Sequence, residues 1–453
     1  MSLSYQSKGK QPLRPAAAIA AFVDTAPETE ILGPGQCPAP IPGRFLSPAL
    51  PVEVLENVVD LCATLYYSDD APTRIASLQA LALTCRALVP RSRMHLFSEI
   101  RIASKSSLRR LVDLLQRSPG HGDFVRQLAF NGSVDWQGCI AGLMFTMLTR
   151  RVKKLWNVEI SYGLTHPHFS FFAMVASYTS VTHLRFSGRN FTQNQDLLKT
   201  IAWFPNLTHL AYESFPLDDK SRENAMPWLN PQRLQKCQLH CLVVDLPSDF
   251  PLADRDVVLA WLPRTGTPET LQKLWLEVKP PLPDRTDHIM VKDFLEVCRT
   301  SIQHLVIKWS TDLLQCGAVN LEYNTSIRTL ILLDIEVKHL GLIENLLRTA
   351  TSKIEELWID VHLLPSSLGS LKTPPPEWGT FDSILTDKPF KPLKAVFVAW
   401  MFEGTDTLGG PDAFTFVQKA LPKLNTAGIL VIVGCSSDPK TRPPDQATFF
   451  FAD

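Results

Sequence analysis

The sequence has no excess of charge of either sign. Lys plus Arg and Asp plus Glu each number 45 in 453 residues, so the formal net charge is zero. A protein that binds nucleic acid or an anionic membrane over much of its surface usually carries a strong basic excess. We therefore expect neither nucleic acid nor a membrane as a partner. A local basic patch remains compatible with the equal numbers of acidic and basic residues.

Long apolar runs and paired cysteines are also missing. No run approaches the ~18 apolar residues of a membrane-spanning helix. The nine cysteines are odd in number, scattered and without a C-x-x-C pair, which favours free thiols in a reducing compartment. The alanine-rich run at 16–23 leads into Asp24 without a clear cleavage site, which disfavours a signal peptide. We expect an intracellular location, in the cytoplasm and/or the nucleus.

Motifs for catalysis are absent as well. The sequence has no G-x-S-x-G, P-loop, H-E-x-x-H or dinucleotide fingerprint. The segments 166–168 and 237–241 contain His and Cys, but a structural zinc site needs four ligands in tetrahedral reach. Cys237 also occupies the leucine position of a repeat, which is typical of a small core residue. We expect no metal, no cofactor and no enzymatic activity.

Proline is abundant, and it marks the two ends of the chain. It accounts for 35 of 453 residues, about 8% against a typical ~5%. Residues 1–46 are rich in proline and poor in large apolar side chains, which predicts a disordered leader. The tail 436–453 is also proline-rich, but it contains Thr448-Phe449-Phe450-Phe451, and we expect those aromatic residues to pack somewhere.

Between the ends lies a repeat of an apolar residue, two mixed residues, Leu, any residue and a second apolar residue. Val181-Thr-His-Leu184-Arg-Phe186 is a clear copy. The central positions of ten copies, two of them weak, are 128, 155, 184, 210, 237, 274, 305, 330, 357 and 396. Their mean spacing of about 30 residues indicates a solenoid or similar array. Alternation of apolar and polar residues within each copy predicts a strand with one buried face.

The intervals between copies carry helical patterns, with apolar residues three and four apart, as in 294–298 and 340–347. A strand and then a helix every ~30 residues resembles a leucine-rich-repeat solenoid over about 120–435. Positions where the family has Asn or Cys hold other residues, such as Arg189 and Ile335, so the resemblance is to an irregular array. The alternative is a generic α/β domain with a parallel sheet. We expect an α/β solenoid at 101–435, with parallel strands on the concave face and helices on the convex face.

Residues flanking each central leucine point away from the core, because successive side chains of a strand alternate. Trp and Arg, which are favoured in protein interfaces, occur among them, and Lys and Arg outnumber Glu. We interpret this face as a target-binding surface; the alternative is that helices or loops cover it. Its candidate residues are Lys154, Trp156, His183, Arg185, His209, Lys236, Lys273, Trp275, His304 and Trp358.

Residues 47–100 have a different pattern, which predicts three short helices. The first is opened by Pro51 and has apolar residues at 54/55, 58/59 and 61/62. The second covers 78–88 and the third 89–97. Such a small all-α head is marginal as a free domain and gains stability by docking onto a neighbour or a partner.

Leu50-Pro51-Val52-Glu53-Val54-Leu55 resembles the opening of the F-box family, and Leu78, Leu81 and Leu83-Thr84-Cys85-Arg86 resemble its later core. The ending Pro90-Arg91-Ser92-Arg93 with Leu96-Phe97 resembles the expanded form of that family in mushroom-forming fungi. The chain departs from the family at Leu88, where a Trp is usual, and in a longer segment at 64–77.

The resemblance implies that the head binds the Skp-type adaptor of an SCF-type cullin-RING ubiquitin ligase and, through it, a cullin. The solenoid would then hold an unknown target protein for ubiquitination, so that catalysis is proximity supplied by the assembly. The adaptor-binding residues implied are Leu50, Pro51, Val54, Leu55, Val58, Leu81, Leu83, Cys85 and Leu96. The alternative is a non-catalytic interaction scaffold whose head only caps the solenoid.

Overall fold

The computed structural model describes the helices and strands of the chain and their nearest connections. The described residues are 51–65, 71–84, 86–130, 148–161, 177–186, 194–213, 237–246, 257–278, 289–308, 319–336, 340–363, 376–386, 390, 393–402 and 411–433. The chain forms two compact units. The first comprises Met1–Phe130 and Arg150–Lys154, and the second comprises Asn131–Thr149 and Leu155–Asp453.

The described part of the first unit begins with the predicted three helices, α2 (Val52–Leu65), α3 (Ala71–Thr84) and α4 (Val89–Ser98). The carbonyl of Pro51 accepts hydrogen bonds from the backbone N–H groups of Val54 and Leu55 at 3.0 and 3.2 Å, which starts α2. The core is made by Val59, Ala63, Leu78 and Leu88. The second helix lies earlier than its predicted range of 78–88. Residues 71–77 contain no glycine and only one proline, in the first turn, so they continue the helix towards its N-terminus.

The same unit continues through β1 (Glu99–Ile102), α5 (Lys105–Arg117), the 3₁₀ helix η1 (Pro119–Asp123) and β2 (Gln127–Phe130). The two strands are parallel, with Ile100 opposite Leu128. Ser104 caps α5, because its hydroxyl accepts the N–H of Ser107 while the Ser107 hydroxyl accepts the N–H of Ser104.

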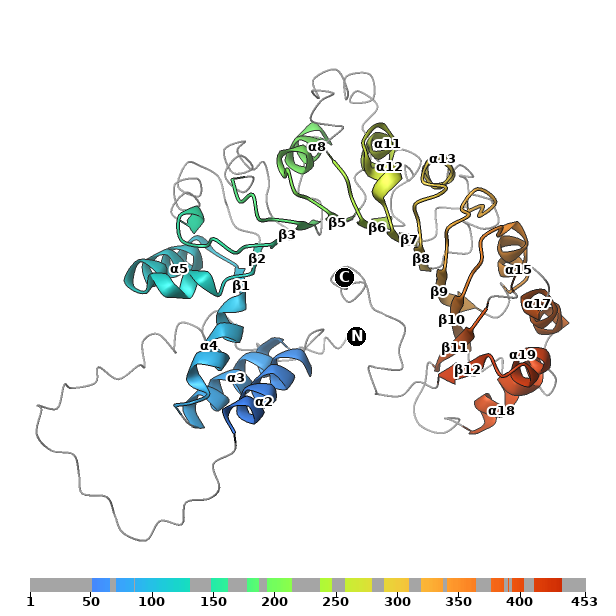
Figure 1. The fold of residues 1–453 in the computed structure, drawn as a ribbon, viewed down its shortest axis with the longest axis horizontal. Coiled ribbons are helices and arrows are strands. Elements are labelled where there is room, and N and C mark those ends of the chain that lie inside the picture. Colours follow the sequence, from blue (N-terminus) through green and yellow to red (C-terminus); the bar gives the residue numbers. More distant parts are fainter. Residues whose placement is uncertain are drawn as a thin grey trace, which may run out of the picture. The chain divides into compact units, whose positions relative to one another are not determined.

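The second unit is built on an all-parallel, open sheet of ten strands in sequence order. The strands are β3 (Asn157–Ile160), β4 (His183–Phe186), β5 (His209–Glu213), β6 (Cys241–Leu246), β7 (Lys273–Val278), β8 (His304–Lys308), β9 (Thr329–Glu336), β10 (Glu356–Leu363), β11 (Ala395–Phe402) and β12 (Leu430–Val433). The strands follow one another along the inside of an arc, and the helices lie outside it (Figure 1). This is the α/β solenoid-like arrangement that the repeat predicts.

The described helices of the second unit each lie between one strand and the next in sequence. They are α8 (Asn194–Trp203), α11 (Val257–Trp261), the 3₁₀ helix η3 (Leu262–Arg264), α12 (Thr267–Thr270), α13 (Ile289–Val297), α15 (Leu340–Thr349), α17 (Pro376–Thr386), α18 (Pro411–Ala420) and α19 (Pro422–Thr426). The predicted patterns at 294–298 and 340–347 fall on or next to α13 and α15.

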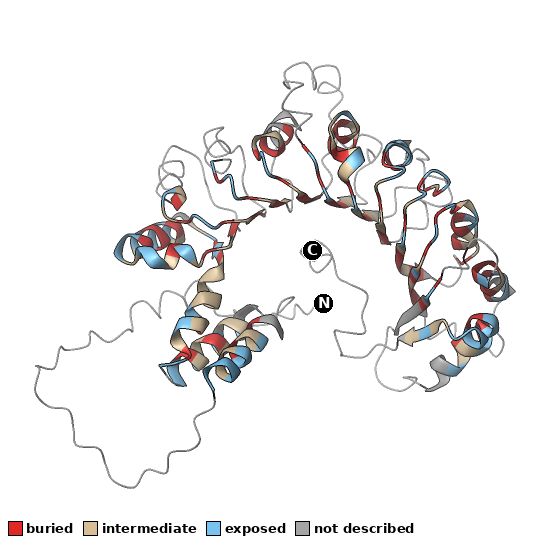
Figure 2. Cartoon of the chain, in the orientation of Figure 1, coloured by how far each residue is buried: buried red, intermediate tan, exposed pale blue. Residues whose placement is uncertain are grey.

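The main core of the second unit lies between the strands and these helices, where Figure 2 shows buried residues. The central residue of each strand from β3 to β11 has an exposed fraction of 0%: Val158, Leu184, Leu210, Leu242, Leu274, Leu305, Leu330, Leu357 and Val396. They lie opposite one another in register along the array. Large side chains of the helices, among them Trp261, Phe294 and Trp378, are equally buried.

In two of the ten predicted copies the sequence pattern selects the wrong frame, so that the wrong residue is assigned to the centre of the strand. The centre of β3 is Val158 rather than Leu155, because Val158 lies opposite Leu184. The centre of β6 is Leu242 rather than Cys237, because Leu242 lies opposite Leu210.

No helix in the described part of the chain is long and apolar enough to cross a membrane.

Candidate functional site

The first candidate surface is the apolar side of the head. Val54, Val58 and Leu61 follow one another at spacings of four and three residues, which places them on one side of α2. Their exposed fractions are 42%, 42% and 57%, and Leu83 at the end of α3 is 79% exposed. Val59, on the other side of α2, is completely buried. The helix therefore has two apolar sides, and one of them is open to solvent.

The residues that the F-box resemblance implies for adaptor binding fall into three groups. Pro51, Val54, Val58 and Leu83 are exposed. Leu55, Leu81 and Leu96 are half-buried and pack against the core of the head, so much of their apolar surface is taken up inside it. Leu50 and Cys85 lie outside the described residues.

Val52 and Leu61 are exposed apolar residues of α2 that the candidate set omits. The sequence could have identified Leu61 through the adjacent apolar pairs at 54/55, 58/59 and 61/62. A helix that buries a single side needs only one apolar residue of each pair, so the other is available for a second surface. Leu88, which stands where the F-box family usually has Trp, belongs to the core of the head.

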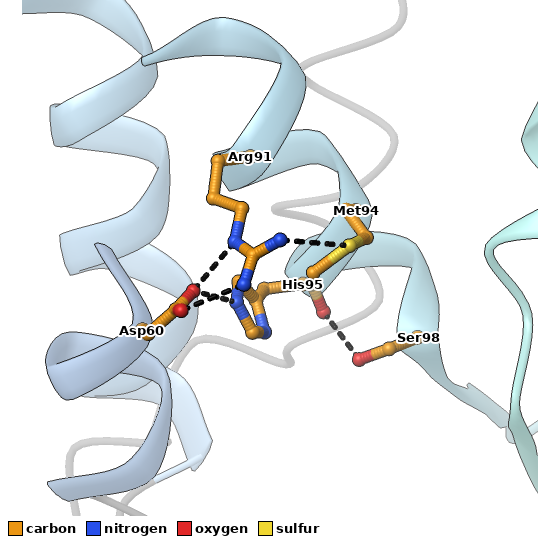
Figure 3. Close-up of polar contacts among 5 residues, drawn as sticks. All are labelled: Asp60, Arg91, Met94, His95 and Ser98. Carbon is orange, nitrogen blue, oxygen red and sulfur yellow. Dashed lines mark hydrogen bonds and ion pairs between the residues drawn. The ribbon is translucent and has the colours of Figure 1, made fainter. Parts of the chain in front are cut away.

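A polar cluster joins α2 to α4 (Figure 3). Both carboxylate oxygens of Asp60 accept hydrogen bonds from Arg91, at 2.7 Å each, and Nε2 of His95 lies 2.7 Å from Asp60 Oδ1. The hydrogen bond from Arg91 is the main reason that the pKa of Asp60 falls to about 2. Burial opposes this shift and His95 adds to it. The cluster connects α2 to α4 through Asp60.

A second ion pair ties the head to the first strand of its unit. Arg74 of α3 donates to Glu99 of β1 at 2.6 Å, with 11% and 13% of the two side chains exposed. Burial alone would raise the pKa of Glu99, but Arg74 and Arg101 together outweigh it and lower the pKa. The three helices are thus joined to the strand that follows them.

The second candidate surface is the face of the ten-stranded sheet that lies away from the helices, here called the inner face. Because side chains alternate along a strand, it carries the first and third residue of β4 to β8 and their partners in register. The register places His183, Arg185, His209, Lys273, Trp275, His304 and Trp358 on this face.

Two of the predicted inner-face residues have other positions, and a third is not described. Trp156 precedes β3 rather than lying within it, and its ring meets His183 edge-on at 4.6 Å between centroids. Lys154 is an exposed residue of the first unit. Lys236 lies outside the described residues. The inner-face positions in β3 and β6 are instead Asn157, Glu159, Cys241 and Val243, because these strands take different frames from those predicted.

The inner face is polar at the starts of β4 and β5. The rings of His183 and His209 stack with centroids 3.8 Å apart and planes 10° apart. Each Nδ1 lies 2.9 Å from the hydroxyl of the threonine before it, Thr182 or Thr208. Burial, with smaller contributions from His209 and Lys273, lowers the pKa of His183 to about 3. His183 is therefore neutral at physiological pH and does not contribute a positive charge to this face.

Acidic residues lie across the ends of three neighbouring strands. Glu213, Asp245 and Glu277 are direct partners in register across β5, β6 and β7. Lys308 of β8 pairs with Glu277 at 2.8 Å and with Asp334 at 3.5 Å. Burial opposes the charge of Lys308, but Glu277 and Asp334 together outweigh it and raise its pKa. The ends of β5, β6 and β7 are thus acidic, and Lys308 at the end of β8 is paired with two of the neighbouring acids.

Between these polar borders runs an apolar stripe along β5 to β9. We call Ala211, Cys241, Val243, Trp275, Val306, Ile331 and Leu333 the inner-face stripe; Trp358 of β10 packs against it. Exposed fractions in the stripe range from 0% for Cys241 to 8% for Leu333. Trp275, proposed from the sequence as an interface residue, is thus buried at 3% exposure.

The described residues contain no group of three or more His, Cys, Asp or Glu side chains that could hold a metal ion. Burial raises the pKa of both Cys237 and Cys241 to about 12, so these thiols are protonated rather than ready to bind a metal. The segment 166–168 lies outside the described residues.

Comparison with known proteins does not assign the chain to a family. No protein-family model matches it, and no curated protein matches it either.

Proposed function

We propose that the chain is the substrate-recognition subunit of an SCF-type cullin-RING ubiquitin ligase. In this proposal the head is an F-box that binds a Skp-type adaptor, and the second unit is an irregular leucine-rich-repeat array that binds a target protein. The protein performs no bond chemistry itself and acts by holding the target near the ubiquitin-conjugating enzyme.

The observation that carries the proposal is the exposed apolar side of the head. Val54, Val58, Leu61 and Leu83 keep 42–79% of their surface exposed, although the head has its own buried core. Exposed apolar residues that gather on one side of an element mark an interaction surface, whereas scattered ones need no explanation. Of these residues, Val54 and Leu83 also lie within the segments that resemble the F-box.

Co-purification with a Skp-type adaptor tests this proposal. Val58→Glu and Leu83→Glu should each weaken adaptor binding at least tenfold, because a charge would have to be desolvated in an apolar interface. Val297→Glu is the matched control, since Val297 is a 45% exposed apolar residue on α13 of the second unit. Circular dichroism should show that all three variants fold, because none of the replaced side chains is buried.

Two results would refute the F-box assignment. The unaltered protein could fail to retain the adaptor, or Val58→Glu and Val297→Glu could bind it equally well. In the first case the head has no adaptor to bind, and in the second the exposed side of α2 is not the surface that binds it.

The second candidate function is an interaction scaffold whose head only caps the array. The Arg74–Glu99 pair favours it, because a nearly buried ion pair joins the head to the strand that follows. In that case removal of residues 51–98 should lower the thermal unfolding midpoint of the remaining chain in the absence of any adaptor. An unchanged midpoint would show that the head is not needed as a cap.

A further inference from the structure

The first unit carries an excess of positive charge that the neutral total of the chain conceals. Residues 105–130 and 150–154 contain nine basic and two acidic residues, which is a net charge of +7. Because the whole chain is neutral, its remaining residues carry a net charge of −7. Attraction for an anionic partner is therefore concentrated in one small part of the chain.

Helix α5 supplies three of these cations from one side. Its other side is buried, with exposed fractions of 0–7% for Leu108, Leu111, Val112 and Leu115. Arg109, Arg110 and Arg117 are exposed. Spacings of seven and eight residues place Arg117 on the same side of the helix as the other two arginines, two turns further on.

The segment Arg150–Lys154 adds further cations near the C-terminal end of α5. Arg151 donates a hydrogen bond from Nη1 to the carbonyl of Leu115 at 2.5 Å, which holds the segment against the helix. The backbone of Gly122 in η1 comes so close to Arg151 that a Cβ would lie 2.3 Å from its carbonyl oxygen, so a side chain does not fit there. The exposed cations of this segment are Arg150, Lys153 and Lys154.

The six exposed cations are here called the basic cluster: Arg109, Arg110, Arg117, Arg150, Lys153 and Lys154. None of them forms an ion pair in the described part of the chain. Exposed cations of the second unit do, since Arg348 pairs with Glu344 at 2.8 Å and Lys394 pairs with Glu355. The cluster is defined by described residues alone; the leader, residues 1–46, and the tail, residues 436–453, lie outside them.

We propose that the basic cluster binds an acidic segment of a partner polypeptide. Four of its six members are arginines, whose planar guanidinium groups donate two parallel hydrogen bonds to a carboxylate. The proposal is independent of the ubiquitin-ligase proposal, because none of the six residues belongs to the three helices of the head.

The arrangement of charge on α5 favours a polypeptide over a nucleic acid. Asp113 is exposed and lies four residues from both Arg109 and Arg117, so the sign of the charge alternates along this side. The two arginines are about 12 Å apart along the helix axis, which is close to the length of four extended residues. Two glutamates four positions apart can therefore reach both arginines, while the neutral residue midway between them lies opposite Asp113.

A nucleic acid matches this arrangement less well. Its backbone carries a charge at every nucleotide and cannot omit the one that would meet Asp113. Single strands are also bound through aromatic side chains on which the bases stack. The described aromatic residues of the first unit, Phe97, Phe124 and Phe130, are half-buried or buried.

Fluorescence anisotropy with the full chain can test the proposal, using a labelled peptide that repeats Glu-Glu-Ser-Glu three times. In an extended peptide of this sequence, glutamate and serine alternate along one side. The unaltered chain should bind the peptide. Raising the salt concentration from about 0.05 M to about 0.3 M should weaken binding, because exposed charges are screened.

A variant without four of the cations should bind the peptide at least about tenfold more weakly, because several exposed ion pairs are lost together. Its substitutions are Arg109→Gln, Arg110→Gln, Arg117→Gln and Lys154→Gln. The matched control removes four exposed cations of the second unit, and it should change binding less than about twofold, since it alters only the net charge. Its substitutions are Lys292→Gln, Arg299→Gln, Lys353→Gln and Lys419→Gln. Circular dichroism should show that both variants fold, because every replaced side chain is exposed.

Three results would overturn the proposal. The unaltered chain could fail to bind the peptide, or the two variants could lose binding equally, which would mean a general attraction between charges. A short DNA duplex, or vesicles that contain phosphatidylserine, could instead bind more tightly than the peptide and lose binding through the same four substitutions. The occupant would then be a nucleic acid or a lipid surface. The variant should still retain the Skp-type adaptor, so failure here is distinguishable from failure of the proposed function.

Discussion

The imidazole of His183 shows how burial sets the behaviour of one residue on the inner face. Its exposed fraction is 6%, it stacks on His209, and its pKa falls to about 3 chiefly because burial disfavours the charged ring. In the unfolded chain the same group has a pKa of about 6.5. Between these two values the unfolded state binds more protons than the folded state, so the free energy of unfolding rises with pH.

We therefore expect His183→Gln to reduce the loss of stability in mild acid. When the pH falls from 7 to 5, the unaltered chain should lose about 1–2 kcal/mol more than the variant, because only the unaltered chain must keep this ring neutral against protonation. Urea denaturation at the two pH values measures the difference. His240→Gln is the control, since His240 is exposed. Equal losses in His183→Gln and the unaltered chain would contradict this account of the ring.

At the scale of the element, helix α2 has one apolar side that packs in the core of the head and another that is exposed to solvent. Val58 and Val59 are adjacent in sequence and chemically identical, yet their exposed fractions are 42% and 0%. Only Val59 joins the core formed with Ala63, Leu78 and Leu88. The stability of the head therefore depends on one of these valines, and binding, in our proposal, depends on the other.

Alanine substitutions should separate the two roles. Val59→Ala should lower the free energy of unfolding by about 2 kcal/mol, because it leaves a cavity in a small core. Val58→Ala should change it by less than about 0.5 kcal/mol. Chemical denaturation followed by circular dichroism provides the comparison. Similar losses in both variants would mean that the exposed side of α2 is covered within the molecule.

The elements also show what the sequence could predict and where it failed. In the clear copies the sequence alone predicts where the strand lies. The apolar residue three places before the central residue is buried as well, as Val181 is before Leu184. One weak copy contains three apolar residues at successive spacings of three, Val152, Leu155 and Val158, and so fits two frames. Only pairing with a neighbouring strand, which is a non-local contact, selects the second frame.

The inner face was harder to predict for the same physical reason. Alternation along each strand correctly separates the residues on this face from those in the main core. Alternation does not reveal whether a face is covered, because that depends on segments distant in sequence. Trp275 therefore has the position expected of an interface anchor but the exposure of a core residue.

At the scale of the whole molecule, the second unit is a linear array in which each strand pairs only with its sequence neighbours. Stability in such an array is approximately a sum of local terms and of interfaces between adjacent repeats. Damage at one end should therefore remain near that end. Asp382 of α17 offers a place to test this, because its carboxylate is 1% exposed and supports the helix that precedes the last strand.

Asp382 accepts hydrogen bonds from the backbone N–H groups of Lys423 at 2.9 Å and Leu424 at 3.0 Å, at the start of α19. Asp382→Ala should cost about 3 kcal/mol locally, because two donors lose their acceptor. Hydrogen exchange followed by mass spectrometry should show faster exchange in α19, β11 and β12 and unchanged exchange in β4 and β5. Asp382→Asn should give an intermediate effect, since one carbonyl oxygen remains. If exchange in β4 and β5 accelerates to the same degree, the array unfolds as a single cooperative body, and changes at its C-terminal end are transmitted along the whole inner face.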